Sequence, residues 1–274
     1  MRYKQNLHTH TTRCDGIDTP EEMIRAAIAK GFHSLGFSGH SSNKYSSYKH
    51  ITHETTRAYR EEIYALKEKY RGEIDIFCGL EFEMLCDDSK EDWEYMIGST
   101  HYLKKDGEVF NIDVTAEQIK KIVNERFGGD GLALAKCYYE HLSNLPQYGN
   151  FDFIGHFDLI AKNIESVPIF DPESREYMSY ATDAMDALKG KIDVFEVNTG
   201  AIARGYRKTP YPMMNLLREL QNRGFSAVIS SDCHDARYLD CCFADAAALL
   251  REAGFTEQYI LTQSGFQAIP LYEK

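Results

Sequence analysis

Strand-like and helix-like segments alternate along almost the whole of this 274-residue chain, and this alternation constrains the fold more than any other feature. Short apolar segments predict strands, and longer amphipathic segments predict helices. Strands that alternate with helices form parallel sheets with right-handed crossovers, and about seven such units in one chain predict closure into a barrel. We therefore expect an α/β fold in which residues 1–274 form a single barrel domain.

The predicted strands lie at residues 3–7, 32–37, 74–82, 96–100, 151–156, 194–198 and 227–230. The predicted helices lie at about 20–30, 54–70, 115–126, 131–144, 172–188, 212–222 and 240–252. The first helix has a complete start signal, because Thr19 can cap it, Pro20 fits its first position and Glu22 completes a capping box. Gly31 then ends this helix.

Composition narrows the classes of function. The net charge of −11 argues against a nucleic-acid partner, because phosphate backbones are bound by fields of lysine and arginine. The seven cysteines include no Cys-x-x-Cys pair and indicate reduced thiols rather than a disulfide framework. The first eight residues lack the apolar core of a signal peptide, and no apolar stretch is long enough to span a bilayer. We expect a cytoplasmic protein without membrane contact, and the oligomeric state stays open.

Metal-binding residue types recur where the predicted strands end. His8 and His10 are two residues apart, so on a strand both side chains face the same side and can bind one ion. Later strands also end in a histidine or a carboxylate, and the carboxyl ends of parallel barrel strands open on one face. The candidate metal ligands are His8, His10, Asp15, His40, Glu81, His101, His156, Asp232 and His234.

Burying nine ionisable groups together without a cation would cost too much free energy, although any one of them could be an ordinary paired polar residue. Nitrogen and oxygen ligands without thiolates suit Zn²⁺, Mn²⁺ or Fe²⁺ better than Ca²⁺. Cys233 lies between two candidate ligands on the chain, so on a strand it points away from them, and we interpret it as a packing residue.

Five segments resemble, in order, the successive motifs of the PHP (polymerase and histidinol phosphatase) superfamily, and most closely its histidinol-phosphate phosphatase branch. The segments are His8-Thr9-His10-Thr11, Gly79-Leu80-Glu81, Gly98-Ser99-Thr100-His101, Gly155-His156-Phe157-Asp158 and Ser231-Asp232-Cys233-His234. The resemblance covers nearly the entire chain. It implies a distorted (β/α)7 TIM-like barrel of the PHP type that binds three divalent metal ions.

The resemblance also implies how the ligands divide among the ions. His8, His10, Glu81 and Asp232 would bind the first. Glu81, His101 and His156 would bind the second, so that Glu81 bridges two ions. Asp15, His40 and His234 would bind the third.

A cationic segment over residues 196–212 follows a predicted strand and therefore lies at the same face as the candidate ligands. Arg204 and Arg207 could clamp phosphate oxygens with their planar guanidinium groups, and the arginines of this segment resemble those of the histidinol-phosphatase branch. An ordinary solvated loop is the alternative. The candidate substrate-binding residues are Arg204, Arg207 and His40, and the sequence favours Arg204 only slightly over Arg207.

Three carboxylates and three divalent ions would leave a charge of roughly +3, which attracts a phosphate group to an otherwise acidic protein. A metal-activated hydroxide would attack phosphorus, with Glu81, Asp232 and His234 as catalytic residues. The proton for the leaving alkoxide could come from Asp232, His234 or a water molecule, and these sources are not separated by the sequence.

We therefore expect hydrolysis of a small phosphate monoester, and specifically of L-histidinol phosphate in histidine biosynthesis. One alternative is a PHP phosphoesterase that acts on nucleotides or sugar phosphates. A second is a metal-binding module without catalysis, and a third is a TIM-like barrel with unrelated chemistry. The remaining histidines, His33, His50, His53 and His141, are expected to lie outside the site, although His50 and His53 could belong to a substrate rim.

Overall fold

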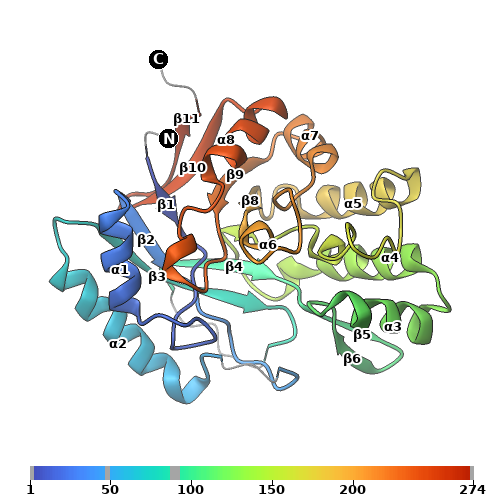
Figure 1. The fold of residues 1–274 in the computed structure, drawn as a ribbon, viewed down its shortest axis with the longest axis horizontal. Coiled ribbons are helices and arrows are strands. Elements are labelled where there is room, and N and C mark those ends of the chain that lie inside the picture. Colours follow the sequence, from blue (N-terminus) through green and yellow to red (C-terminus); the bar gives the residue numbers. More distant parts are fainter. Residues whose placement is uncertain (1–2, 47–49, 87–92, 272–274) are drawn as a thin grey trace.

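The computed structural model describes residues 3–46, 50–86 and 93–271 (Figure 1). Within these ranges seven parallel strands are hydrogen-bonded side by side in chain order. They are β1 (Gln5–Asn6), β2 (Ser34–Phe37), β3 (Asp75–Glu83), β4 (Tyr95–Ser99), β7 (Phe153–Ile154), β8 (Val194–Asn198) and β9 (Ser226–Ser230). Every predicted strand is present, and the expectation of a distorted TIM-like α/β barrel is confirmed.

The first and last strands meet, so that the sheet is nearly closed. Beyond the ends of β1 and β9, Thr9 and Cys233 form a parallel bridge. In this bridge the His10 amide donates to the Cys233 carbonyl (2.8 Å), and the Cys233 amide donates to the His8 carbonyl (3.0 Å). The same contact brings the candidate ligands that follow β1 next to those that follow β9.

Helices cover the outer face of the barrel (Figure 1). They are α1 (Pro20–Ala29), α2 (His53–Lys69), α3 (Ala116–Phe127), α4 (Gly131–Leu142), α5 (Arg175–Leu188), α7 (Met214–Asn222) and α8 (Phe243–Glu252). The predicted start of α1 is confirmed, because the Thr19 hydroxyl accepts from the Glu22 amide and the Glu22 carboxylate accepts from the Thr19 amide.

The sequence prediction omitted two antiparallel hairpins and a short helix. The hairpins are β5 (Tyr102–Lys105) with β6 (Glu108–Asn111), and β10 (Glu257–Thr262) with β11 (Gly265–Pro270). The helix α6 (Gly200–Ala203) lies in the cationic segment over residues 196–212, for which no helix was predicted before residue 212. The β5–β6 turn carries a readable signal, because Asp106 and Gly107 have positive φ angles of 51° and 85°, as two-residue hairpin turns require.

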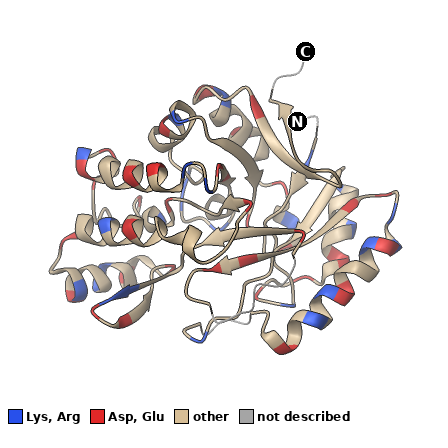
Figure 2. Ribbon diagram, turned by 180° about the vertical axis from the view of Figure 1, so that it is seen from behind, with Lys and Arg blue, Asp and Glu red and all other residues tan. Residues whose placement is uncertain are grey.

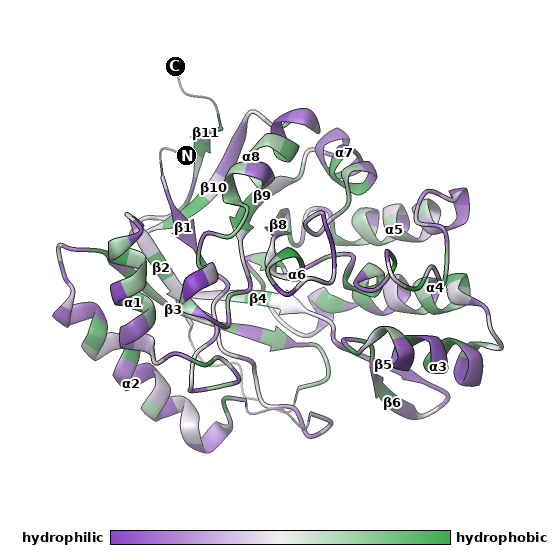
Figure 3. Ribbon diagram, viewed as in Figure 1, coloured by the Kyte–Doolittle hydropathy of each residue, from purple (hydrophilic) through white to green (hydrophobic). Residues whose placement is uncertain are grey.

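Short single-turn helices complete the connections among the described residues, at Leu145–Gln147, Leu159–Ala161 and Ala236–Tyr238. Apolar positions gather on the strands and on the helix faces that pack against them (Figure 3). Lysine and arginine positions mix with aspartate and glutamate along the helices (Figure 2). No helix of the described ranges has the length and apolarity that crossing a bilayer requires.

Tyr95 packs closely against the neighbouring strands of the barrel. Tyr95 is 1% exposed, and its hydroxyl donates to the Leu7 carbonyl (2.6 Å). A Cβ atom at Gly79 would lie 2.5 Å from the Tyr95 ring, so only glycine fits opposite it. Phe77 shares the inward face of β3 with Gly79 and Glu81 because strand side chains alternate. An apolar floor therefore lies below the carboxylate of Glu81.

Candidate metal centre

Each of the nine candidate ligands lies at, or shortly after, the carboxyl end of a barrel strand, and the structure brings all nine together. They are His8 and His10 after β1, Asp15 in the loop that follows, His40 after β2, Glu81 in β3, His101 after β4, His156 after β7, and Asp232 and His234 after β9.

Glu81 is 1% exposed and lies at the centre of this set. Its Oε2 atom faces His8 Nε2 (3.2 Å) and His40 Nδ1 (2.7 Å). Its Oε1 atom faces His156 Nε2 (2.9 Å) and His101 Nε2 (3.5 Å). The two oxygens therefore point to different groups of imidazoles, which is the arrangement of a carboxylate that bridges two ions.

His8, His10, Glu81 and Asp232 surround a space of the size of one metal ion. The Nε2 atoms of His8 and His10 lie 3.2 and 3.6 Å from Glu81 Oε2, and 3.6 and 3.2 Å from Asp232 Oδ1. Ligand atoms at about 2.0–2.2 Å from a tetrahedral Zn²⁺ are separated by roughly 3.3–3.6 Å. These four side chains are those that the family resemblance assigns to the first ion.

The buried atoms that face this space lack hydrogen-bond partners. Within the described residues His8 Nε2, His10 Nε2 and Glu81 Oε2 are buried and form no hydrogen bond, although Glu81 Oε2 lies within ion-pair distance of His40 Nδ1. Buried polar atoms without a partner are rare because each costs about 1–3 kcal/mol. A cation that accepts these lone pairs removes the cost, so the donor set fits a divalent ion.

Asp15, His40 and His234 form a second surrounded space, nearer the solvent. Asp15 Oδ1 lies 3.3 Å from His234 Nε2, and Asp15 Oδ2 lies 3.4 Å from His40 Nε2. His10 Nδ1 is 3.7 Å from Asp15 Oδ1, so His10 contributes to this group as well as to the first. The resemblance implied His10 as a ligand of the first ion alone.

Two buried glutamates hold the imidazoles in place. His8 Nδ1 donates to Glu196 Oε1 (2.6 Å), which fixes the tautomer that leaves the Nε2 lone pair free for an ion. The other Glu196 oxygen accepts from the His156 amide (2.8 Å). His101 donates to Glu83 Oε2 through both its amide (2.7 Å) and Nδ1 (3.0 Å).

Neither glutamate was assigned a role from the sequence, although signals were present. Glu196 is a charged residue inside an otherwise apolar strand, β8, and is fully buried. Glu83 is two residues after Glu81 on β3 and therefore shares its face.

The backbone is strained at two candidate ligands. His156 and Asp232 have positive φ angles of 24° and 47°, in a region that non-glycine residues rarely adopt. Such strain costs on the order of 1–3 kcal/mol and concentrates at functional sites, where surrounding contacts maintain it. Here the carboxylate of Glu196 fixes the His156 amide, and Arg204 fixes the Asp232 carbonyl (2.9 Å).

Charged neighbours set the pKa values of the ion-free centre. Burial lowers the pKa of His8, but Glu196 and the other carboxylates raise it well above its usual value. Burial raises the pKa of Glu81, but the imidazoles around it hold that pKa well below its usual value. His10 differs, because burial together with His234 and His40 lowers its pKa to about 3. His10 is therefore neutral and ready to bind an ion, whereas His8 must first lose a proton.

The two predicted arginines have different surroundings. Arg204 lines the cavity, and its guanidinium contacts Asp232 Oδ2 (2.8 Å) and His234 Nδ1 (3.3 Å). Arg207 has a fully buried side chain that contacts Asp158 (3.1 Å), so it does not line the cavity. Of the two arginines, Arg204 alone lines the cavity.

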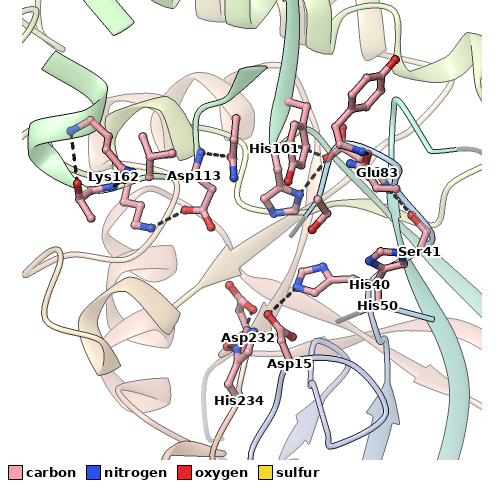
Figure 4. Close-up of a pocket in the computed structure, with 18 of the residues that line it drawn as sticks. Asp15, His40, Ser41, His50, Glu83, His101, Asp113, Lys162, Asp232 and His234 are labelled. Atoms are coloured by element: carbon pink, nitrogen blue, oxygen red, sulfur yellow. Dashed lines mark hydrogen bonds and ion pairs between the residues drawn. The ribbon is translucent and has the colours of Figure 1, made fainter. Parts of the chain in front are cut away.

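The centre opens into a cavity of about 510 Å³ (Figure 4). Asp15, Asp232 and His234 lie close together on one side of it, and the His40 ring points toward Asp15. This volume is within the range of small-ligand sites. Of the other four histidines only His50 lines the cavity. His33 stacks on Tyr3, and His53 and His141 lie in α2 and α4.

Comparison with known proteins agrees with this geometry. The PHP domain family matches residues 6–200 of the chain. A protein of Deinococcus radiodurans named "Probable histidinol-phosphatase" is 30% identical over 263 residues, which cover 90% of this chain and 92% of that protein. A protein of Schizosaccharomyces pombe with the same name is 28% identical over 262 residues, covering 86% and 81%.

A solved structure supports the fold. It is that of histidinol phosphate phosphatase from Lactococcus lactis, complexed with zinc, L-histidinol and phosphate. The superposition has a TM-score of 0.71 at 19% identity and covers 96% of this chain and 98% of that one.

Proposed function

We propose that this chain, which belongs to the PHP domain family, is a metal-dependent phosphatase that hydrolyses L-histidinol phosphate to L-histidinol and phosphate. The observation that carries the proposal is the cluster of nine nitrogen- and oxygen-bearing side chains, Glu81 among them, beside a cavity that Arg204 lines. The names of the relatives support the choice of substrate. The reaction would serve histidine biosynthesis, and the seven free cysteines fit the reducing cytoplasm in which it would take place.

We further propose that the centre holds three divalent ions. Imidazole and carboxylate ligands suit zinc, manganese and iron, and the zinc in the Lactococcus structure favours zinc. Divalent ions in this centre would lower the pKa of coordinated water toward neutrality and offset the charge of a phosphate group. The single barrel domain over residues 1–274 is also a proposal, which the bonds between Gln5 in β1 and Leu261 in β10 support.

The residues of the chain determine where a phosphate can bind. The ligand carboxylates, together with Glu83 and Glu196, contribute about −5, and three divalent ions contribute about +6. Arg204 adds a further positive charge at the cavity wall, so the centre attracts a phosphate dianion although the chain carries −11. Because Asp232 orients the Arg204 fork from one side, its remaining N–H groups can donate to non-bridging phosphate oxygens.

An imidazole that binds an ion through Nε2 has no proton to give from that atom, so we propose that the leaving alkoxide takes its proton from a water molecule beside His234. The His234 side chain is 26% exposed at the cavity, and its Nδ1 atom lies near the Asp232 carbonyl (3.0 Å) and Arg204. Asp232 is 7% exposed and ion-paired to Arg204, whose guanidinium holds its pKa low against the effect of burial. A carboxylate that stays ionised is a poor acid, so Asp232 positions Arg204 and binds metal instead.

Arg207 has a structural role in this proposal. Its pair with Asp158 is fully buried, and its guanidinium also stacks over the Tyr211 ring at 4.5 Å. Asp158 accepts in addition from the Met213 amide (3.3 Å), so the pair connects the segments that follow β7 and α6.

The exclusion of a nucleic-acid partner stays a prediction from composition.

A substrate panel tests the proposal directly. The purified chain, loaded with zinc or manganese, is assayed for phosphate release from L-histidinol phosphate, a nucleoside monophosphate, a sugar phosphate and a phosphodiester. We expect the highest kcat/KM for L-histidinol phosphate and loss of activity after chelation. Bound metal without turnover on any ester would instead indicate a binding module, and a preference for nucleotides or sugar phosphates would reassign the substrate.

A further inference from the structure

One carboxylate of the cavity has no role in the metal centre. The acids that line the cavity in the described ranges are Asp15, Glu83, Asp113 and Asp232. Asp15 and Asp232 belong to the surrounded ion spaces, and Glu83 orients His101. Asp113 follows the end of β6 and lies on the cavity wall across from His40 (Figure 4).

Asp113 is held firmly in this position by its own segment and by the segment that follows β7. Asn111 Oδ1 accepts from the Asp113 amide (2.7 Å), and Asn163 Nδ2 donates to the Val114 carbonyl (2.9 Å). Lys162 Nζ donates to Asp113 Oδ1 (2.5 Å). Such a carboxylate is ordered before a ligand arrives, which lowers the entropy cost of binding.

Both members of this ion pair line the cavity, and the carboxylate is the more exposed of the two. The Asp113 side chain is 37% exposed, whereas that of Lys162 is 11% exposed. The Lys162 ammonium lies between Asp113 and the Tyr206 ring, 4.2 Å from the ring centroid. Because Lys162 occupies Oδ1, the Oδ2 atom stays available to a donor in the cavity.

The pKa of Asp113 supports an ionised acceptor. Burial raises the pKa of Asp113, but the nearby groups Lys162, His101 and Arg204 together lower it by more, so that this pKa lies below its usual value. The carboxylate therefore carries its negative charge at neutral pH.

The proposed substrate has a group that needs such an acceptor. L-Histidinol phosphate carries an ammonium on the carbon next to its ester carbon, so the cation enters the cavity together with the phosphate. An ammonium loses water when it enters a protein site, and the loss is offset only by a charged hydrogen-bond partner. Metal ions, Arg204 and Lys162 would repel it, and a carboxylate in the cavity wall offsets that repulsion.

We propose that Asp113 is a specificity-determining residue that binds the substrate ammonium, and that it selects phosphate monoesters with a cationic amine beside the ester carbon. The proposal rests on the proposed function and deepens it. Lys162 is then a positioning residue, which orients Asp113.

The experiment compares two substrates that differ only in the amine, L-histidinol phosphate and its deamino analogue 3-(imidazol-4-yl)propyl phosphate. Asp113→Asn is expected to lower kcat/KM for the amine substrate by roughly 10- to 100-fold, mainly through KM, since hydrogen bonds to charged groups have about this worth. The deamino analogue should change by less than about threefold. The matched control is Asp106→Asn in the turn of the same hairpin, whose side chain is 83% exposed, and it should leave both substrates unchanged.

A double variant, Asp113→Asn with Lys162→Met, guards against misfolding, because it leaves no buried cation without a partner. It should show the same selective loss at an unchanged thermal midpoint. Equal losses on both substrates would mean that Lys162 binds the phosphate, and this result overturns the proposal, as does the absence of any loss.

The two proposals fail in different ways. If the wild-type chain cleaves neither imidazole ester, the proposed function is wrong, and the Asp113 variants are then assayed with 2-aminoethyl phosphate and ethyl phosphate. A selective loss on the aminoethyl ester would retain the ammonium site without histidinol phosphate, whereas equal rates would reject that site too.

Discussion

The two ends of the barrel bury polar side chains in opposite ways. At the carboxyl end, His8 Nε2, His10 Nε2 and Glu81 Oε2 have no hydrogen-bond partner in the described part of the chain. At the amino end, Gln5 is also buried, at 6% exposure, but its amide bonds to Ser34 Oγ (2.6 Å) and to the carbonyl and amide of Leu261 (2.7 and 2.8 Å). Gln5 thereby connects β1 to the β10–β11 hairpin. At the carboxyl end the unpaired imidazole and carboxylate atoms face one another and form a candidate ligand site, whereas at the amino end the complete pairing of Gln5 indicates a structural role.

The largest effect on activity and metal content is expected for Glu81→Gln, because Glu81 is the residue at the centre of the candidate metal site. The amide keeps the shape but loses the charge that both groups of imidazoles face. We expect phosphatase activity to fall by more than the roughly 100-fold that loss of an outer-sphere partner costs. Elemental analysis should show loss of more than one ion per chain. A variant that keeps full metal content would exclude a bridging role.

The sequence was sufficient to predict the cluster of candidate ligands at the carboxyl end of the barrel, but not the contacts of Gln5 at the amino end. The ligands at the carboxyl end carry distinctive residue types at strand ends, so their convergence follows from parallel topology alone. Gln5 is an ordinary polar residue in an otherwise weak strand pattern, and its partner lies 256 positions away in a hairpin that the periodicity did not predict. Contacts of such separation depend on the tertiary packing.

The residues that surround the candidate ligands could be predicted from the sequence only in part. Glu196 was visible as a charge in a buried strand, but its bond to His8 depends on how β8 faces β1 across the barrel. Arg204 and Arg207 are three positions apart and have the same chemistry, so the sequence could not separate them. The turn after α6 directs Arg204 into the cavity and Arg207 onto Asp158.

A second and smaller effect, a loss of metal affinity, is expected for Glu196→Gln. The change leaves the ligand atoms intact and weakens the bonds that orient His8 and the His156 amide. Outer-sphere changes of this kind typically lower metal affinity by about 10- to 100-fold. Competition with a chromogenic chelator measures the affinity. The matched control is Glu252→Gln, a carboxylate that pairs with Arg218 on the helical surface, and it should bind metal like the wild type.

Gln5→Leu tests the other end of the barrel. The substitution leaves the backbone groups of Leu261 without their partner, at a cost of about 1–3 kcal/mol. For a chain of this size each kcal/mol lowers Tm by roughly 2–4 °C. Calorimetry should show this loss, while metal affinity and kcat stay at wild-type values. A loss of metal affinity at unchanged Tm would contradict the separation of the two ends.

The smallest effect concerns pH, and it sharpens the contrast because the imidazoles at the carboxyl end titrate and the Gln5 amide does not. In the ion-free chain the carboxylates raise the pKa of His8, His40 and His101 above 6.5 despite their burial. Their contribution to stability is present in full below pH 6.5 and is lost as the pH rises through their folded-state pKa values. Ions require the same imidazoles to be neutral, so stabilisation by metal grows as the pH rises.

The Tm difference between zinc-loaded and chelated protein should therefore widen between pH 6 and pH 8. Gln5→Leu should lower both melting curves without changing how that difference depends on pH, because an amide does not titrate. Glu196→Gln should change that dependence, since Glu196 is the largest contributor among the carboxylates that raise the pKa of His8. A difference that narrows with rising pH would show that the imidazoles do not release protons when they bind metal, and would remove the link between unpaired polar atoms and ion binding.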